Sequence, residues 1–368
     1  MKYFLLLMLA ICLIVQGSVA QTQSDSVSIA IDTVIVAIDT VKSISIIGVG
    51  DLMLGSNFPS KYYLPTNNNC YPLLADVKNV LQGADLTIGN LEGCFSDTAP
   101  LVKRCKDSTL CYAFRMPEKY VFCLKDAGFD VLTIANNHSG DFGDLGRETT
   151  VKLLDSLEIK HAGWLKYPTS IITVKGLKIG IAAFSPNSGT VSIIDTINAK
   201  YIVANLADSC DIVIVTFHGG AEGSKHQHVT KETETFYGEN RGNVYEFSRA
   251  VIHAGADVVF GHGPHVARAI DIYHGKIIAY SLGNFCTYGR FNLKGPNGLA
   301  PILKINIDVS GNFLNGKIIS AKQPGGVGIG TEIDEYLGAA KIIRELTQAD
   351  LPESKINIDT EGNITVHP

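Results

Sequence analysis

The chain has 368 residues, of which 46% are hydrophobic and 18% are charged, so it can bury one large core or two small ones. The formal net charge is −5 and no basic stripe runs along the sequence, which argues against a nucleic-acid partner.

Residues 1–20 have the pattern of a secretory signal peptide. Lys2 supplies the positive charge, residues 4–15 form an apolar core, and residues 18–20 resemble a cleavage site of small residues. This core is short for a bilayer span. We therefore expect an exported protein, periplasmic or associated with the cell envelope, whose signal is cleaved. An uncleaved anchor helix and a lipoprotein modified at Cys12 are the alternatives.

Residues 21–44 are predicted to be an N-terminal tether or an edge strand. The sequence AIDTV occurs at residues 30–34 and again at residues 37–41, with the alternation of a strand. This crude repeat carries no evident chemistry, and both interpretations stay open.

Six short apolar runs in the main domain, residues 45–320, each end in a residue that can bind a metal or form hydrogen bonds. Apolar runs of this length, several of them rich in Val and Ile, predict buried strands. The runs cover residues 45–51, 85–92, 130–138, 211–218, 257–265 and 276–284.

Helices and hairpins are predicted between these runs. One helix begins after Pro117 and ends at Gly128, and others cover residues 144–157 and 244–253. Three segments each consist of two β-rich runs around a turn that contains Gly, which predicts hairpins at residues 171–184, 270–280 and 304–320. Together these elements predict an α/β fold of layered mixed β-sheets flanked by helices.

Residues 321–368 are predicted to form a C-terminal appendage packed on the main domain. They begin with a Gly-rich stretch at residues 324–330, and they contain a helix near residues 337–346 and a terminal hairpin around Gly362.

Export also changes what is expected of the cysteines, because disulfides form in oxidising compartments. Cys105 and Cys111 bracket a short polar loop, and we predict a local disulfide between them. No CxxC pair occurs, which argues against a zinc site built from thiolates. The sequence does not assign partners to the remaining cysteines of the mature chain, which are Cys70, Cys94, Cys123, Cys210 and Cys286.

The polar residues at the strand ends predict a metal site. Ligands of open α/β sheets collect outside the carboxyl ends of the strands, and carboxylate, amide and imidazole donors together suit Mn, Fe or Zn better than Ca. The number of donors favours two divalent ions, with Glu92 as the bridging carboxylate. The predicted ligands are Asp51, Glu92, Asn137, His218, His262 and His265, with His138 beside them.

Two other site types find no support in the sequence. There is no GxxxxGK[ST] sequence, and no GxGxxG follows a strand and opens a helix, which argues against a phosphate-binding loop. There is also no GxSxG sequence that would mark a nucleophilic serine.

Taken together, the motifs resemble the poly-γ-glutamate capsule biosynthesis protein CapA family. They are, in chain order, GVGDLMLGS, GNLEG, FDVLTIANNHSGDFG, TFHGGAEG, YGENRG and GADVVFGHGPHVARAIDIYHGKIIAYSLGNF, and the resemblance covers roughly residues 45–345. The resemblance implies a sandwich fold similar to that of the calcineurin-like metallophosphoesterases. It also implies an anionic polymer or phosphoester as substrate, and a capsule-synthesis membrane complex as partner.

The resemblance assigns roles residue by residue. Asp51 matches the aspartate that opens the phosphoesterase set and is counted as catalytic. Asn137 and His138 match the Asn-His pair, in which Asn binds metal and His protonates the leaving group. Residues that match polar positions near the cleft are expected to bind substrate: Asp141, Glu222, Asn240, Arg241, Ser281 and Asn284.

Three departures from the phosphoesterase pattern affect the expected activity. Met53 stands where an Asp-x-His motif would have histidine, Glu92 is one methylene longer than aspartate, and His262 and His265 are spaced i, i+3. On a regular strand only i and i+2 point the same way, so a turn at residues 263–264 must redirect His265.

The expected function is therefore metal-dependent hydrolysis or handling of an anionic extracellular substrate in capsule biosynthesis. A non-catalytic accessory protein that binds or exports a polymer is one alternative, and a periplasmic nucleotidase is another.

Overall fold

The structure is a computed structural model that describes residues 43–104, 111–326 and 329–367. The predicted signal peptide, most of the predicted tether and Cys105 lie outside these residues. The signal peptide, the tether and the Cys105–Cys111 pairing therefore stay predictions. Among the described residues, no helix is both long enough and apolar enough to span a membrane.

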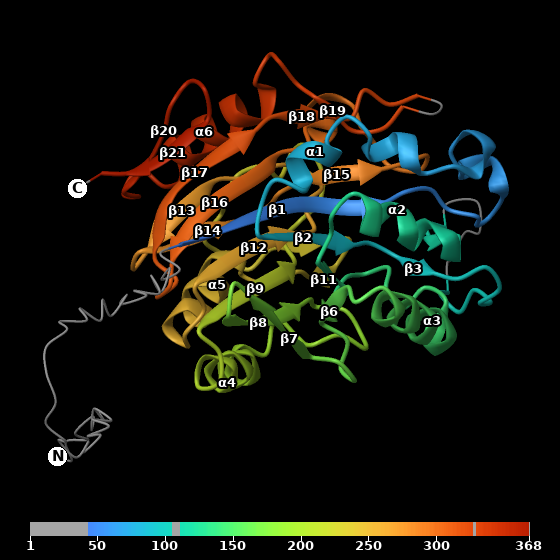
Figure 1. Ribbon diagram of the computed structural model, residues 1–368, viewed down its shortest axis with the longest axis horizontal. Helices are drawn as coiled ribbons and strands as arrows, with labels where there is room; N and C mark the ends of the chain where they lie inside the picture. Colours follow the sequence, from blue (N-terminus) through green and yellow to red (C-terminus); the bar gives the residue numbers. More distant parts are fainter. Residues whose placement is uncertain (1–42, 105–110, 327–328, 368) are drawn as a thin grey trace, which may run out of the picture. The chain divides into compact units, whose positions relative to one another are not determined.

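The larger sheet in the described part of the chain has nine strands, and β1 (Ser43–Met53) runs through its middle (Figure 1). The order is β20-β21-β17-β16-β1-β2-β5-β6. Strand β16 pairs with β1 at Ser43–Val49, and β15 pairs with the end of β1 at Asp51–Met53. The strands β1, β2, β5 and β6 are parallel, whereas β16 is antiparallel to β1. The bounds are β2 Leu86–Leu91, β5 Val131–Thr133, β6 Lys160–Ala162, β15 Asn284–Thr287, β16 Ile302–Asp308, β17 Phe313–Ile319, β20 Ile356–Ile358 and β21 Asn363–Val366.

The second sheet has six strands within the described ranges, in the order β13-β14-β12-β9-β8-β7. Its four central strands, β14, β12, β9 and β8, are parallel, and hairpin partners close both edges. The bounds are β7 Thr169–Val174, β8 Leu177–Phe184, β9 Ile212–His218, β12 Val258–His262, β13 Ile270–Tyr273 and β14 Lys276–Ala279.

Helices α1 to α5 cover the outer faces of this two-sheet sandwich, whereas α6 packs against β17 of the larger sheet and β13 of the smaller one. The helices are α1 Lys78–Leu81, α2 Val121–Asp126, α3 Gly143–Ser156, α4 Thr196–Ala207, α5 Val244–His253 and α6 Gly338–Asp350. The 3-10 helices are η1 Lys61–Tyr63, η2 Thr66–Asn68, η3 Tyr71–Leu74, η5 Glu118–Tyr120 and η6 Gly295–Gly298. The short pairs are β3 Cys94–Phe95 with β4 Arg115–Met116, β10 Thr235–Phe236 with β11 Glu239–Asn240, and β18 Ala321–Lys322 with β19 Glu332–Ile333.

The hydrophobic core explains the layers. One buried cluster joins the facing sides of the two sheets, because Ile46 and Ile88 of the larger sheet pack with Ile181, Ile214 and Val258 of the smaller one. A second cluster lies under α2 and α3, and a third lies under α4 and α5. The predicted fold class, layered mixed β-sheets flanked by helices, is therefore confirmed.

Several local predictions are also confirmed. The predicted helix at residues 244–253 is α5, and the three predicted hairpins are β7–β8, β13–β14 and β16–β17. The run at residues 276–284 is not one strand, because β14 ends at Ala279 and Asn284 begins β15 in the other sheet. Strand β21 pairs with β17, so residues near the C-terminus extend the larger sheet. The domain boundaries themselves stay predictions.

One disulfide links segments that the sequence left unassigned. Cys70 is bonded to Cys123, across 53 positions of the chain. It ties the start of η3 to α2 on the outer face of the larger sheet. Cys94, Cys210 and Cys286 are free thiols.

Candidate metal centre

The candidate metal centre lies where strands of both sheets end. In the larger sheet β1 carries Asp51, and Glu92 directly follows β2. In the smaller sheet β9 ends at His218 and the parallel β12 ends at His262, and these two histidines are register partners. Parallel strands present their carboxyl ends at one edge, so each sheet contributes donors to the same seam.

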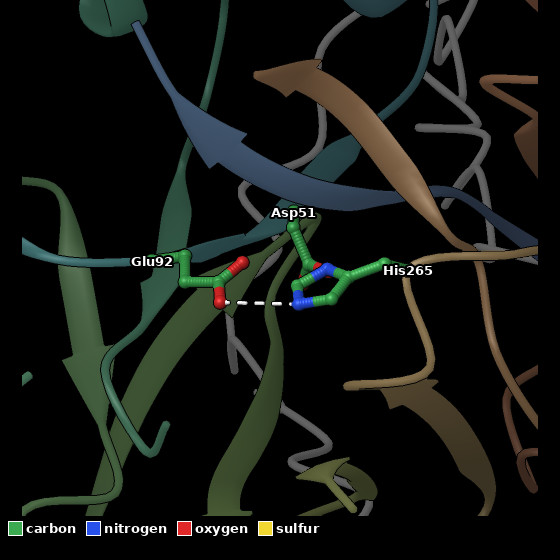
Figure 2. A group of neighbouring side chains, drawn as sticks. All are labelled: Asp51, Glu92 and His265. Carbon is green, nitrogen blue, oxygen red and sulfur yellow. Dashed lines mark hydrogen bonds and ion pairs between the residues drawn. The ribbon is translucent and has the colours of Figure 1, made fainter. Parts of the chain in front are cut away.

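The donor atoms are close enough to share an ion. Asp51 Oδ2 lies 3.0 Å from His265 Nδ1, and Glu92 Oε1 lies 3.5 Å from His265 Nε2 (Figure 2). One ligand atom from each of these three residues lies within 4.8 Å of the other two. On the other side of the carboxylate, Asp51 Oδ1 lies 3.6 Å from His262 Nδ1 and 4.0 Å from His218 Nδ1.

A tight turn brings His265 back to the strand end. Gly263 has φ +110°, and a Cβ at this position would lie 2.8 Å from backbone atoms of Gly219, so the turn requires glycine. His265 itself has φ +56°, in the left-handed region. The redirection that the i, i+3 spacing demanded is therefore present, and it turns the His265 ring toward both carboxylates.

Several buried oxygen and nitrogen atoms that could bind a metal here have no hydrogen-bond partner among the described residues. These are both carboxylate oxygens of Glu92, Nε2 of His218, both ring nitrogens of His262 and Oδ1 of Asn137. Buried polar atoms are almost always hydrogen-bonded, since an unpaired one costs about 1–3 kcal/mol. Carboxylate, imidazole and amide atoms left unpaired together are what a divalent metal would satisfy. The residues present therefore fit a metal site.

The pKa values follow from burial and from the crowding of charges. Burial alone would raise the pKa of Asp51, but the hydrogen bond and charge of His265 bring it down to about 2. Burial raises the pKa of Glu92 well above its usual range. Burial lowers the pKa of His218 well below normal and that of His262 to about 4, so both rings are neutral, the form that binds metals. Burial opposes a charge on His265, but Glu92 and Asp51 outweigh it and raise its pKa to about 10.

His138 lies at the edge of the cluster in a fixed orientation. Its Nδ1 lies 2.7 Å from Asp141 Oδ2, and its Nε2 lies 3.9 Å from Glu92 Oε1. The ring packs against Phe114 at a centroid distance of 4.1 Å. Lys103 Nζ contacts the other oxygen of Asp141 at 3.1 Å. Burial lowers the pKa of His138 despite the neighbouring Asp141.

The centre opens into a cleft of about 530 Å³ with charged and aromatic walls. Arg241 is 2% exposed, and its Nη2 lies 3.1 Å from Glu222 Oε1. Glu222 Oε2 in turn lies 3.9 Å from His265 Nε2. The predicted residues that line the cleft are Asn137, His138, Glu222, Arg241, His265 and Asn284.

Three residues predicted to bind substrate have other contacts. Asp141 lies behind His138 and accepts a hydrogen bond from the backbone N–H of Phe114. Ser281 donates to the carbonyl of Val266 at 2.7 Å, and Asn240 is exposed and accepts from the backbone N–H of Gly242. None of the three is among the residues that line the cleft.

Two asparagines beside the predicted ligands were not predicted as part of the site. Asn90 donates to Asp51 Oδ1 at 2.8 Å and lies 3.4 Å from His218 Nδ1. Asn136 donates to Asn90 Oδ1 and to the Leu91 carbonyl, and it accepts from the His138 backbone. The signal for Asn90 was its place two residues before Glu92, in the same apolar run.

Comparison with known proteins gives a family and several relatives. The family model described as Bacterial capsule synthesis protein PGA_cap matches residues 45–288. The Capsule biosynthesis protein CapA of Bacillus anthracis is 28% identical over 249 residues, which cover 64% of this chain and 58% of that protein. The PGA biosynthesis protein CapA of Bacillus subtilis (strain 168) is 28% identical over 253 residues, covering 64% and 61%. The chain thus spans about three-fifths of the length of these relatives.

Solved structures give weaker likenesses. A hypothetical protein from Thermus thermophilus aligns with TM-score 0.46 and 13% identity, over 76% of this chain and 100% of that one. A 5'-nucleotidase precursor from the same organism aligns with TM-score 0.40 and 11% identity, over 84% and 59%. Likenesses this low carry no conclusion about function.

Proposed function

Because the chain belongs to the bacterial capsule synthesis protein PGA_cap family, we propose that it is an exported protein that binds divalent metal and hydrolyses an anionic ester of phosphoester type. The substrate is an extracellular polymer or a precursor of one. The metal is Mn, Fe or Zn, and the donor count supports two ions. The proposed partner is a capsule-synthesis complex in the membrane.

One observation carries this proposal, namely that unpaired metal-type donors from two sheets converge in a buried seam. Asp51 and Glu92 are fully buried, as are His218 and His262. A core that merely tolerated polar residues would pair them with one another. Here the Glu92 carboxylate and the His262 ring lack hydrogen bonds within the described part of the chain, which supports a site built to receive cations.

The surrounding residues support hydrolysis. A divalent ion at this seam would lower the pKa of a water molecule and stabilise charge that develops on the substrate. Asp141 fixes the His138 ring through Nδ1 and favours its protonated form, in which Nε2–H is directed toward Glu92 and can donate its proton to a leaving group. Arg241 at the cleft wall can bind an anionic oxygen through Nη2, which forms an ion pair with Glu222 but makes no hydrogen bond among the described residues.

The test combines elemental analysis with a substrate panel. Mature protein purified without chelator is expected to carry stoichiometric Mn, Fe or Zn and to turn over model phosphodiesters such as bis-p-nitrophenyl phosphate. Asp51→Ala and His218→Ala should lose metal and turnover together. His253→Ala is the matched control, because His253 is exposed at the end of α5 and should change neither. Full turnover by metal-free Asp51→Ala protein would exclude this mechanism.

A non-catalytic, polymer-binding role is the second candidate, and Met53 favours it. Met53 stands where phosphoesterases of the Asp-x-His type carry a histidine, and its side chain is fully buried in the core. A protein of this kind would retain anionic polymer in the cleft but release no product. Metal-loaded protein that binds poly-γ-glutamate and turns over no ester in the panel would establish this role instead.

A further inference from the structure

A second cavity of about 470 Å³ lies beside the metal cleft and shares a wall with it. Phe291 lines both spaces. Its neighbours alternate, because Arg290 and Asn292 face the cleft whereas Gly289 and Leu293 face the cavity. The segment at residues 289–293 is therefore the partition between the two spaces.

The residues that line the two spaces differ in charge. The cleft is lined by Lys103, Glu222, Glu239, Arg241 and Arg290. None of the described residues that line the cavity is an acid or a base; they are tyrosines, a phenylalanine, aliphatic residues, glycines, Cys286, Thr66, Thr287 and Gln323. Burying an ionised group without a partner is expensive, so this cavity selects a neutral occupant.

Gln323 offers the cavity a hydrogen-bond donor whose orientation is fixed by the protein. It is 5% exposed, and its Oε1 accepts from the backbone N–H of Thr287 at 2.6 Å and from its hydroxyl at 3.1 Å. These two donors fix which end of the amide is oxygen. Nε2 is then a buried donor with no hydrogen-bond partner among the described residues. A ligand hydroxyl or carbonyl in the cavity would satisfy it.

Aromatic rings connect the cavity to the proposed proton donor. Phe291 stacks on Phe114 at a centroid distance of 4.9 Å, and Phe114 packs on His138 at 4.1 Å. At the rim, the Arg290 guanidinium lies 5.0 Å from the Tyr63 ring and 4.8 Å from the Tyr112 ring. A ligand that spans the partition would thus have one end beside His138 and would contact the Arg290 guanidinium between the two spaces.

We propose that the cavity is a subsite for a neutral, hydroxylated sugar unit that is linked to the anionic ester bound at the metal centre. Rings pack the apolar faces of such a unit, and the Gln323 amide donates to a hydroxyl or an acetamido carbonyl. A glutamate polymer fits less well, because it carries a carboxylate on every residue. This subsite deepens the proposed function and rests on it, since the anionic end is assigned to the metal cleft.

Binding of defined probes to the mature protein tests the subsite. Saturation-transfer NMR with methyl glucoside and with N-acetylglucosamine is expected to show binding, whereas γ-glutamylglutamate should not enter the cavity. Gln323→Leu should weaken the binding of at least one sugar about three- to tenfold, as loss of one hydrogen bond predicts. Gln348→Leu, at an exposed glutamine of α6, is the matched control and should have no effect.

A second variant controls for loss of binding that results from misfolding of Gln323→Leu. Leu293→Trp fills the cavity from its rim without altering Gln323 and should also prevent sugar binding. The thermal transition of each variant shows whether it is folded. The proposal is overturned if neither sugar binds, if both folded variants bind sugar as the wild type does, or if the dipeptide is the ligand that Gln323→Leu loses.

Failure of the proposed function would look different. Metal and turnover depend on His218, which does not line the cavity. His218→Ala protein should therefore lose metal yet still bind the sugars. Sugar binding without any metal in the wild-type protein would refute the metal hydrolase and leave the subsite intact.

Discussion

Replacing Glu234 by glutamine should loosen one wall of the cleft. Glu234 and Arg268 are 7% and 0% exposed, and two parallel hydrogen bonds of 2.7 Å join them. Arg268 also donates to the carbonyls of Ala221 and His226, and Glu234 accepts from the Ala221 N–H. This buried pair therefore ties together the segment at residues 219–242, which carries Glu222 and Arg241.

The expected cost follows from the burial of the pair. Glu234→Gln leaves the Arg268 guanidinium buried without its counter-charge, and breaking a buried pair in this way costs about 3–5 kcal/mol. Whole domains are stable by only about 5–15 kcal/mol. The double variant Glu234→Leu/Arg268→Met removes both charges and should be the milder change. Asp126→Asn breaks the exposed pair with Lys78 and should cost less than about 1 kcal/mol.

Urea unfolding of the wild type and these three variants measures the differences, and hydrogen exchange locates them. In Glu234→Gln, amides of residues 219–242 should exchange faster, while those of β9 within the core should change only with global stability. Unfolding of Glu234→Gln at the same urea concentration as the wild type would refute a stabilising role of the buried pair. A double variant less stable than the single one would refute the cost assigned to the unpaired Arg268 charge.

Three further predictions concern other contacts. Asn90→Leu removes the donor that holds the carboxylate at the end of β1 and should weaken Mn binding about 10–100-fold in calorimetry; unchanged affinity would show that Asn90 orients nothing. Replacing Cys70 and Cys123 by serine opens a loop with a sequence separation of 53 and should cost up to about 4 kcal/mol in urea unfolding; a reductant should destabilise the wild type more than this variant. Partial burial opposes ionisation of Asp85, yet hydrogen bonds from Lys175 and Ser45 lower its pKa below 3.8 overall. The stabilisation by Asp85 is therefore complete above that pH and is lost as the pH falls through the lowered pKa, so the stability gap between wild type and Asp85→Ala should close in acid.

Much of the strand framework could be predicted from the sequence, because buried parallel strands need nearly continuous apolar runs. From the polar residues at the ends of these runs, Asp51, Glu92, His218 and His262 could be predicted to lie together, although the division into two sheets was not known. The run that ends at Asn284 shows the limit of this reasoning. It is largely apolar, and only the structure separates β14 of one sheet from β15 of the other.

Contacts between residues that are distant in the sequence could not be predicted. Cys70 and Cys123 meet because η3 and α2 cover the same face of the larger sheet, and the spacing of the cysteines in the sequence does not show this. The neutral cavity is similar, since its described walls come from three separate parts of the chain, which include Tyr62–Leu64, Cys286–Gly289 and Gly325–Gly326. Asn90 was missed for a different reason, because a lone asparagine inside an apolar run is ambiguous until its partner is known.

Several irregular positions of the backbone lie where the donors meet. The pairing register of β1 shifts at Asp51 against both of its parallel neighbours, and such bulges re-aim a side chain. Next to it, a Cβ on Gly50 would lie 2.0 Å from the Gly283 carbonyl oxygen, so glycine allows the strand to approach residues 281–284. Gly263 and His265 hold positive-φ conformations at the other side of the seam. Deviations of this kind persist only where the surrounding structure enforces them. Two apolar sheets supply that enforcement here, and irregular positions gathered around Asp51 are better explained by a requirement to aim donors than by the packing of the core.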